Sequence, residues 1–324
     1  MSIRRLLNIV PAVLPLFIPV LILVFRGNLK ETDRQDLNNP VTDLKPGTGN
    51  SILLPFKNAG RLLITDAVID GVAGNLVFDS GASEIVLNRT YFRNHARTGT
   101  AGQRGITGNV GDVERVHLGV INLPGLELKG IDASLTDLSH IENRRGVKIT
   151  GLFGFELLKG YEVTIDAVNN LMELNPEGSV SREEKRGKPD VIMKAEIRKN
   201  IIFMRGEIAG SSLLFCLDTG AEISVISSHC PKQVLRTFTV NRRVTLKGAG
   251  LNTTQVMHGK LDEIRFGSRS LRNFEAIVAG LDDLSEVYGI KTDGMLGYNF
   301  LRETVISINF ATGQVSLWFN KNQQ

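Results

Sequence analysis

The sequence predicts an all-β protein made of two similar units, preceded by a hydrophobic N-terminal helix. An apolar strand runs into Asp-Ser-Gly-Ala at residues 79–82, and another runs into Asp-Thr-Gly-Ala at residues 218–221. Each motif is followed, at nearly the same interval, by a Gly-x-x-Gly block, at residues 151–154 and 294–297. These blocks indicate an internal duplication, because chance rarely reproduces both order and spacing.

Each copy also ends in a segment that alternates apolar and polar residues across a short turn, which is typical of a β-hairpin. The paired segments are residues 161–166 with 171–174 in the first copy, and residues 304–309 with 315–318 in the second. Helical patterns are short and lie chiefly at residues 155–159 and 299–302. The remaining sequence favours strands.

Polar segments separate the expected domains. Residues 27–50 contain Pro and Gly but little apolar periodicity, so we expect a tether there. A second polar stretch, residues 178–188, is expected to link the two copies. The sequence therefore predicts a first lobe at residues 51–177 and a second lobe at residues 189–320.

Residues 1–26 are expected to form a membrane anchor or a signal segment. From Leu6 to Phe25 the chain carries no charge, and this length suffices for a helix to cross a bilayer, although three prolines would kink it. A secretory signal is the alternative, but no small-x-small cleavage site follows Phe25, which favours an uncleaved anchor. Arginines flank the segment, and positive ends stay cytoplasmic. The rest of the chain is therefore expected to be periplasmic or extracellular, and secreted if the segment is cleaved.

Charge and cysteine content argue against several classes of function. The formal charge is +4, but Lys and Arg are scattered among acids, so we expect no nucleic-acid partner. Cys216 and Cys230 are too few for a disulfide framework or a zinc site, although a single bridge between them stays open. Cys216 lies in an apolar run, where a small buried residue is expected. The five histidines are scattered singly, so we expect neither a metal nor a cofactor.

The paired motifs suggest a specific chemistry. One Asp-Ser/Thr-Gly motif alone is typical of a turn after a strand, but two matched copies point to Asp79 and Asp218 as a functional pair. When two carboxyl groups share one proton, the ionised group can activate water while the protonated group polarises a carbonyl. Hydroxyls can fix the two loops, and glycines let the backbone approach the carboxylates. The residues expected in these supporting roles are Ser80, Gly81, Thr219 and Gly220.

These motifs resemble those of the retropepsin-like and pepsin-like aspartic peptidases, and the short lobes are similar to those of bacterial aspartyl proteases with two fused retropepsin-like lobes. The resemblance covers residues 51–320 and implies a bilobal, pseudo-twofold fold with one catalytic Asp per lobe and hairpin flaps over a cleft. By position, the flap tips would be Gly105, Ile106, Thr107 and Gly108 in one lobe, and Lys247, Gly248, Ala249 and Gly250 in the other. The chain departs from the family pattern at Ile85, where the second lobe has Ser224, and neither flap region contains the Tyr of pepsin-like enzymes.

The resemblance implies an aspartic endopeptidase that needs no cofactor and cleaves an extended peptide or protein. Because both Asp residues lie in one chain, a monomer is expected to be active. The alternative is a peptide-binding protein of the same fold without activity, but two intact motifs favour the enzyme. A serine hydrolase is disfavoured, because no His is placed to form a legible triad with Ser83 or Ser224. The glycine-rich residues 99–111 lack the Gly-Lys-Ser/Thr ending of a phosphate-binding loop.

Overall fold

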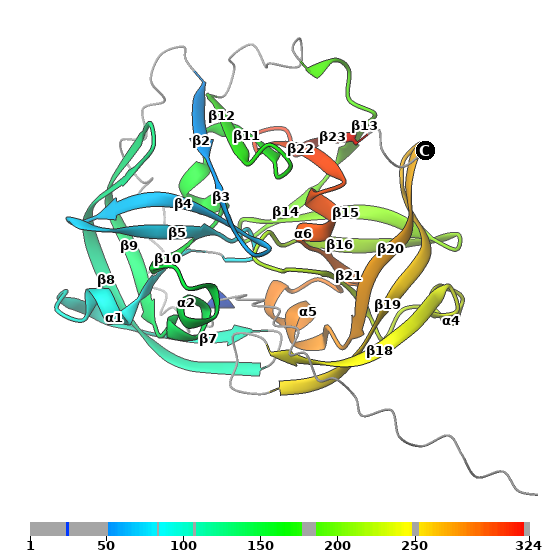
Figure 1. The fold of residues 1–324 in the computed structure, drawn as a ribbon, viewed down its shortest axis with the longest axis horizontal. Coiled ribbons are helices and arrows are strands. Elements are labelled where there is room, and N and C mark those ends of the chain that lie inside the picture. The colour runs from blue at the N-terminus through cyan, green and yellow to red at the C-terminus, as the bar shows by residue number, and fades with distance from the viewer. Residues whose placement is uncertain are drawn as a thin grey trace, which may run out of the picture.

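Two β-rich lobes share one sheet in the computed structural model of this chain (Figure 1). The structure describes residues 24–25, 51–82, 84–105, 108–176, 186–247 and 253–320. We call residues 51–176 lobe 1 and residues 189–320 lobe 2. The described strands form three sheets, of which one lies mainly in lobe 1, one lies in lobe 2 and one is built by both. The predicted β-rich, two-lobed architecture is thus confirmed.

Lobe 1 is built on a nine-stranded sheet whose strands turn one face toward the core. In β4, Ala67 and Ile69 are buried while Asp66 and Val68 point outward, which is the two-residue period of a half-buried strand. The spatial order is β1 (Val24–Phe25), β7 (Arg97–Gly105), β8 (Gly108–Leu123), β9 (Leu126–Thr136), β6 (Ile85–Asn88), β10 (Ile149–Phe153), β5 (Val72–Phe78), β4 (Leu62–Ile69) and β3 (Lys57–Ala59). The helices are α1 (Arg89–Phe92), α2 (Ser139–Arg145) and the 3-10 helix η3 (Phe155–Leu158).

Lobe 2 repeats this plan with an eight-stranded sheet. The spatial order is β14 (Glu196–Arg198), β15 (Ile201–Ile208), β16 (Ser211–Leu217), β21 (Gly294–Leu296), β17 (Ser224–Ser227), β20 (Arg269–Ala279), β19 (Thr253–Phe266) and β18 (Phe238–Lys247). Its helices are α4 (Lys232–Leu235), α5 (Asp282–Tyr288) and α6 (Tyr298–Leu301). In both lobes a strand that arrives late in the chain, β10 or β21, inserts parallel to β5 or β16 and antiparallel to β6 or β17.

The third sheet joins the lobes. Its spatial order is β13 (Val191–Lys194), β23 (Gln314–Phe319), β22 (Thr304–Asn309), β11 (Tyr161–Asp166), β12 (Leu171–Pro176) and β2 (Ile52–Pro55). The two predicted hairpins, β11–β12 and β22–β23, are confirmed and lie side by side at its centre. There Thr164 faces Ser307, and Thr164 Oγ1 donates a hydrogen bond to Ser307 Oγ at 2.9 Å.

One hydrophobic core runs through both lobes, and a second cluster in lobe 2 packs the sheet against α5. Phe78 of lobe 1 contacts Phe153 and Phe155, with ring centroids 5.2 and 5.4 Å apart, close to where β5 ends. The predicted helical segments are confirmed as η3 and α6. Helices α2 and α5 were not expected, because seven residues give too little apolar periodicity to stand out in the sequence.

The predicted N-terminal helix is not seen in the described part of the chain. Of residues 1–50, which include the expected tether, the structure describes only residues 24–25. Most of the expected linker also lies outside the described residues. Val24 and Phe25, the end of the expected helix, form β1, which pairs with β7. β-branched and aromatic residues favour such pairing. None of the helices that the structure describes is long and apolar enough to span a membrane.

Candidate active site

Asp79 and Asp218 occupy matching positions at the ends of two buried strands. The N–H of Asp79 donates to the carbonyl of Phe153 in β10 at 2.8 Å, and the N–H of Asp218 donates to the carbonyl of Leu296 in β21 at 2.9 Å. In each lobe, therefore, the inserted strand holds the first residue of the Asp-Ser/Thr-Gly motif. The motif then turns toward the lobe boundary.

Four hydrogen bonds brace the two loops across that boundary. The N–H of Ser80 donates to Thr219 Oγ1, and the N–H of Thr219 donates to Ser80 Oγ, both at 2.9 Å. Each hydroxyl also donates to the opposite strand, Ser80 Oγ to the Leu217 carbonyl at 3.0 Å and Thr219 Oγ1 to the Phe78 carbonyl at 2.8 Å. All four bonds are buried, so each lobe fixes the loop of the other.

The glycines of the two motifs lie against the opposite carboxyl groups. A Cβ atom at Gly220 would lie 2.5–2.6 Å from the carboxyl of Asp79, and one at Gly81 would lie 2.9–3.0 Å from that of Asp218. A side chain at either position would therefore displace the facing carboxyl group. Each glycine N–H also donates to its own Asp, at 2.9 Å from Oδ1 in both loops.

The two carboxyl groups are buried and act on each other. Asp79 and Asp218 are each 1% exposed. Burial, with the nearby Asp218 carboxyl as the second cause, raises the pKa of Asp79 well above its usual range. Burial raises the pKa of Asp218 to about 6, while interaction with Asp79 and the N–H groups of its own loop opposes the rise. The pair therefore retains one proton near neutral pH.

Long hairpins occupy the positions at which the sequence predicts the flaps. In lobe 1, β7 and β8 form a hairpin whose last pair is Gly105 opposite Gly108. In lobe 2, β18 and β19 form a hairpin whose last pair is Lys247 opposite Thr253. The other predicted tip residues lie outside the described residues: Ile106, Thr107, Gly248, Ala249 and Gly250.

An ion pair across the lobe boundary escaped the sequence analysis. Arg145, the last residue of α2, pairs with Glu222, which stands four positions after Asp218, and their side chains are 11% and 8% exposed. Arg61 of lobe 1 adds a hydrogen bond from Nη1 to the Glu222 carbonyl at 3.4 Å and lies 3.7 Å from the Glu275 carboxylate. Lobe 1 thus contacts the Asp218-loop side of lobe 2 through charged groups, and no periodicity in the sequence could show that.

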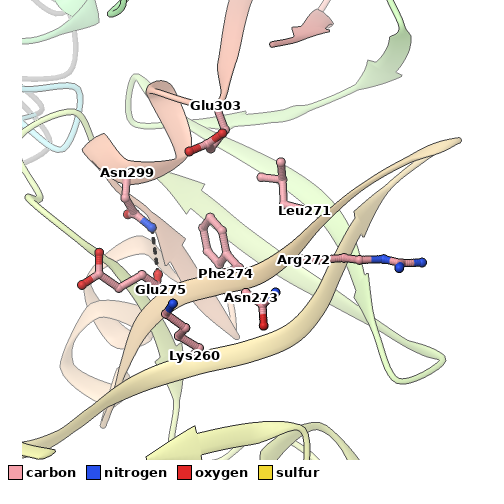
Figure 2. Close-up of a pocket in the computed structure, with 8 residues that line it drawn as sticks. All are labelled: Lys260, Leu271, Arg272, Asn273, Phe274, Glu275, Asn299 and Glu303. Carbon is pink, nitrogen blue, oxygen red and sulfur yellow. Dashed lines mark hydrogen bonds between the residues drawn. The ribbon is translucent and has the colours of Figure 1, made fainter. Parts of the chain in front are cut away.

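A hydrogen-bond network behind the Asp218 loop leads to a surface pocket. Ser224 Oγ donates to Asn299 Oδ1 at 2.9 Å, and Asn299 Nδ2 donates to the Glu275 carbonyl at 2.8 Å (Figure 2). The pocket has a volume of ≈ 330 Å³, and Lys260 and Glu303 also line it. Charged side chains of both signs line the pocket, and neither Asp79 nor Asp218 is among its lining residues. We therefore assign its described residues to supporting the Asp218 loop and not to a separate reaction.

The remaining candidates have structural surroundings. Cys216 and Cys230 are free and buried, so no bridge joins them, and Cys216 is the small buried residue that the sequence predicted. His258 is buried beside Glu275, with Nε2 and Oε1 2.9 Å apart. Within the described ranges, no group of three or more His, Cys, Asp or Glu side chains could hold a metal ion.

Comparison with known proteins places this geometry in context. Residues 204–303 match a family described as "gag-polyprotein putative aspartyl protease". The fold is similar to that of an aspartic proteinase from Irpex lacteus, with a TM-score of 0.54 and 11% identity over 84% of this chain and 98% of that one. It is also similar to basic 7S globulin from soybean, with a TM-score of 0.49 and 10% identity over 83% and 94% of the two chains. Among curated protein sequences, none matches. The family match and the shared fold confirm the resemblance to retropepsin-like and pepsin-like aspartic peptidases.

Proposed function

We propose that this chain is an aspartic endopeptidase in which Asp79 and Asp218 together activate a water molecule for attack on a peptide bond. The observation that carries the proposal is the meeting of the two motif loops. Two buried carboxyl groups from different lobes face each other, and matched hydroxyl and glycine contacts hold them there. Such a pair can act as base and acid in the same step.

In this proposal the two carboxyl groups divide the roles of base and acid, and the direction of their pKa shifts supports the division. Asp218 is the ionised base and takes a proton from water, while Asp79 gives its proton to the carbonyl oxygen of the substrate as the water oxygen bonds to the carbonyl carbon. The product of this step is a neutral gem-diol. Its C–N bond then breaks as Asp218 passes its proton to the leaving nitrogen, and a diol hydroxyl returns a proton to Asp79. The pair ends in its starting state.

The same pKa values predict the acid limb of the activity profile. Below pH of about 6 Asp218 becomes protonated and can no longer take a proton from water, so kcat/KM should fall as pH decreases through that value. At higher pH the profile should fall again when Asp79 loses its proton. A profile that keeps rising down to pH 3 would contradict this assignment.

The direct test is peptide cleavage with single and double variants. A peptide library should give defined cuts, and Asp79→Asn or Asp218→Asn should each lower kcat/KM by about 10²–10⁴-fold while circular dichroism stays unchanged. The double variant should be barely worse than either single one, because the two groups act as a unit. Near-normal cleavage by Asp79→Asn would refute the mechanism. A folded chain that binds peptides without cutting them would favour the binding protein.

We also propose that the hairpins β7–β8 and β18–β19 close over an extended substrate as flaps. Strand β18 is the edge of the lobe 2 sheet, and β7 is covered in the lobe 1 sheet only by the two residues of β1 among the described residues. This supports the proposal, because edge strands can hydrogen-bond to a peptide. Hydrogen exchange at Gly105 and Gly108 should be faster than in the Asp79 strand and should slow when a peptide is bound. Exchange as slow as in β5 without peptide would mean that these residues belong to the core.

Membrane attachment through Leu6–Phe25 stays a proposal that rests on the uncharged length of this segment. The expected result is that the full chain sediments with membranes and that protease added outside sealed cells digests residues 51–320. A mature chain that starts near residue 27 and washes off membranes would contradict the anchor.

A further inference from the structure

Tyr288 ends helix α5 with a buried hydroxyl that has no hydrogen-bond partner among the described residues. The residue is 3% exposed, and its ring packs edge-on against Phe203 with centroids 5.4 Å apart. Phe203 stands opposite Cys216 in the β15–β16 ladder, so this contact places Tyr288 beside the strand that leads to Asp218. A buried hydroxyl without a partner costs ~1–3 kcal/mol, and packing alone would be served as well by Phe.

The backbone beneath Tyr288 is held in place. Gly289 follows in a left-handed conformation and its N–H donates to the Glu286 carbonyl at 3.3 Å. The N–H of Thr292 donates to Ser285 Oγ at 3.0 Å and closes the helix end. The backbone from which the Tyr288 side chain projects is therefore fixed in lobe 2.

Asp218 has a matching unsatisfied atom. Its Oδ1 accepts hydrogen bonds from the N–H groups of Gly220 and Ala221 at 2.9 and 3.1 Å. Its Oδ2 is buried and, apart from the side-chain hydrogen bond that this carboxyl group shares with Asp79, has no partner among the described residues. Cys216 and Asp218 are two residues apart, so the strand period directs both toward the same side, where Cys216 and Tyr288 share one hydrophobic cluster. Burial, and after it the charges of Cys216, Asp218 and Asp79, raise the pKa of Tyr288 well above its usual range.

We propose that Tyr288 is a positioning residue for Asp218, its hydroxyl donating a hydrogen bond, through one bound water, to Asp218 Oδ2. A buried water commonly satisfies polar atoms that lack protein partners, and here it would satisfy both at once. The link would favour the ionised form of Asp218 over that of Asp79, so it deepens the proposed function and rests on it. Arg145 occupies the equivalent position in lobe 1 and pairs with Glu222 instead, so this position does not supply Asp79 with the same link.

The experiment measures the titration of Asp218 directly and does not depend on turnover. Carboxyl ¹³C signals of Asp are followed against pH in the full chain, with Asp218→Asn used for assignment. Tyr288→Phe should raise the pKa of Asp218 by about one unit, which is the effect of losing a hydrogen bond to a charged group. The matched control is Tyr161→Phe in β11, because Tyr161 is equally buried and only its burial raises its pKa. The groups that act on Asp218, which are the Asp79 carboxyl and the N–H groups of Gly220 and Ala221, are unchanged in either variant.

Activity and the unmodified chain supply two further readouts. The acid limb of kcat/KM should shift upward with the Asp218 titration in Tyr288→Phe and stay in place in Tyr161→Phe. In the unmodified chain, the Tyr288 ¹³Cζ signal should titrate with the same midpoint as Asp218 and lose this step in Asp218→Asn, which keeps the test valid if Tyr288→Phe does not fold. Equal Asp218 titrations in both Phe variants, or a flat Tyr288 signal, overturn the proposal. A shifted titration in a chain that cleaves no peptide would instead refute the endopeptidase function alone.

Discussion

Lobes 1 and 2 follow the same chain path, yet they brace their Asp loops with different chemistry. In lobe 1 the loop continues into Glu84, which accepts a hydrogen bond from Ser134 and lies 3.4 Å from the Arg115 guanidinium. At the corresponding positions lobe 2 has Ile223 and Ile277, which belong to its apolar cluster. One lobe therefore supports the loop with a buried acid, and the other supports it with packing.

The next position along each loop reverses the contrast. Ile85 is apolar in lobe 1, whereas Ser224 of lobe 2 bonds to Asn299 and accepts the Gly297 N–H at 3.0 Å. The fold thus requires that each loop be braced but does not fix how. Because the ionisable braces are Glu84 in lobe 1 and the Arg145–Glu222 pair at the boundary, the sensitivity of this molecule to pH and charge should be concentrated there.

The largest effect is expected where the lobes meet through charge. Arg145→Ala leaves Glu222 buried without its partner and should lower the free energy of unfolding by ~3–5 kcal/mol. The matched control is Arg61→Ala, because Arg61 is more exposed and its contacts with lobe 2 are longer. Urea denaturation measures both. Equal losses of unfolding free energy in the two variants would show that the Arg145 contact contributes no more to stability than the Arg61 contacts.

A slightly smaller effect is expected in the pH dependence of stability, which should distinguish lobe 1 from lobe 2. Burial raises the pKa of Glu84 from 4.5 to about 7, so the folded state disfavours the charged form. The stability contributed by neutral Glu84 is complete below pH 4.5 and is lost as pH rises through 7, which amounts to about 3 kcal/mol. Glu84→Gln should flatten this dependence in urea denaturation at several pH values. The exposed Glu127→Gln should leave it unchanged, and an equally steep curve in Glu84→Gln would show that Glu84 is not its source.

The two motif glycines test how symmetric the Asp pair is. Gly220→Ala should lower kcat/KM by about 10²-fold or more, because the new Cβ atom must displace the Asp79 carboxyl from its working position. Gly81→Ala should cost less, since its Cβ atom would lie farther from the Asp218 carboxyl. If Gly81→Ala is the more harmful change, activity tolerates displacement of the Asp218 carboxyl less than displacement of the Asp79 carboxyl.

The smallest effect concerns the neutral brace of lobe 2. Ser224→Ala leaves the Gly297 N–H and Asn299 Oδ1 each short of one hydrogen bond, and should cost ~1–3 kcal/mol. Ile85→Val in lobe 1 removes one methylene group and should cost about 0.5–1.5 kcal/mol. Thermal unfolding measures the loss of stability in both variants. A larger loss in Ile85→Val would show that packing at this position contributes more to stability than the hydrogen bonds of Ser224.

The sequence analysis located the Asp pair because duplication makes a weak motif specific. Once two copies of one unit were recognised, pseudo-symmetry placed Asp79 against Asp218, and alternation predicted the hairpins of the shared sheet. The Arg145–Glu222 pair could not be found this way, because it depends on how two lobes dock and breaks the symmetry that guided the prediction. Tyr288 was equally hidden, since an aromatic residue near a helix end looks like core until its hydroxyl proves to be unpaired.

The shared sheet also constrains how the chain folds while it is being made. β11 completes one side of its ladder with β12, but its other side waits for β22. During synthesis, residues 177–303 must be added first, which takes on the order of 10 s at typical elongation rates. Throughout that interval a nascent lobe 1 presents an unpaired strand edge, which can pair wrongly with the same strand of another unfinished chain. Crowded polysomes should therefore be the setting in which this protein is most prone to aggregate.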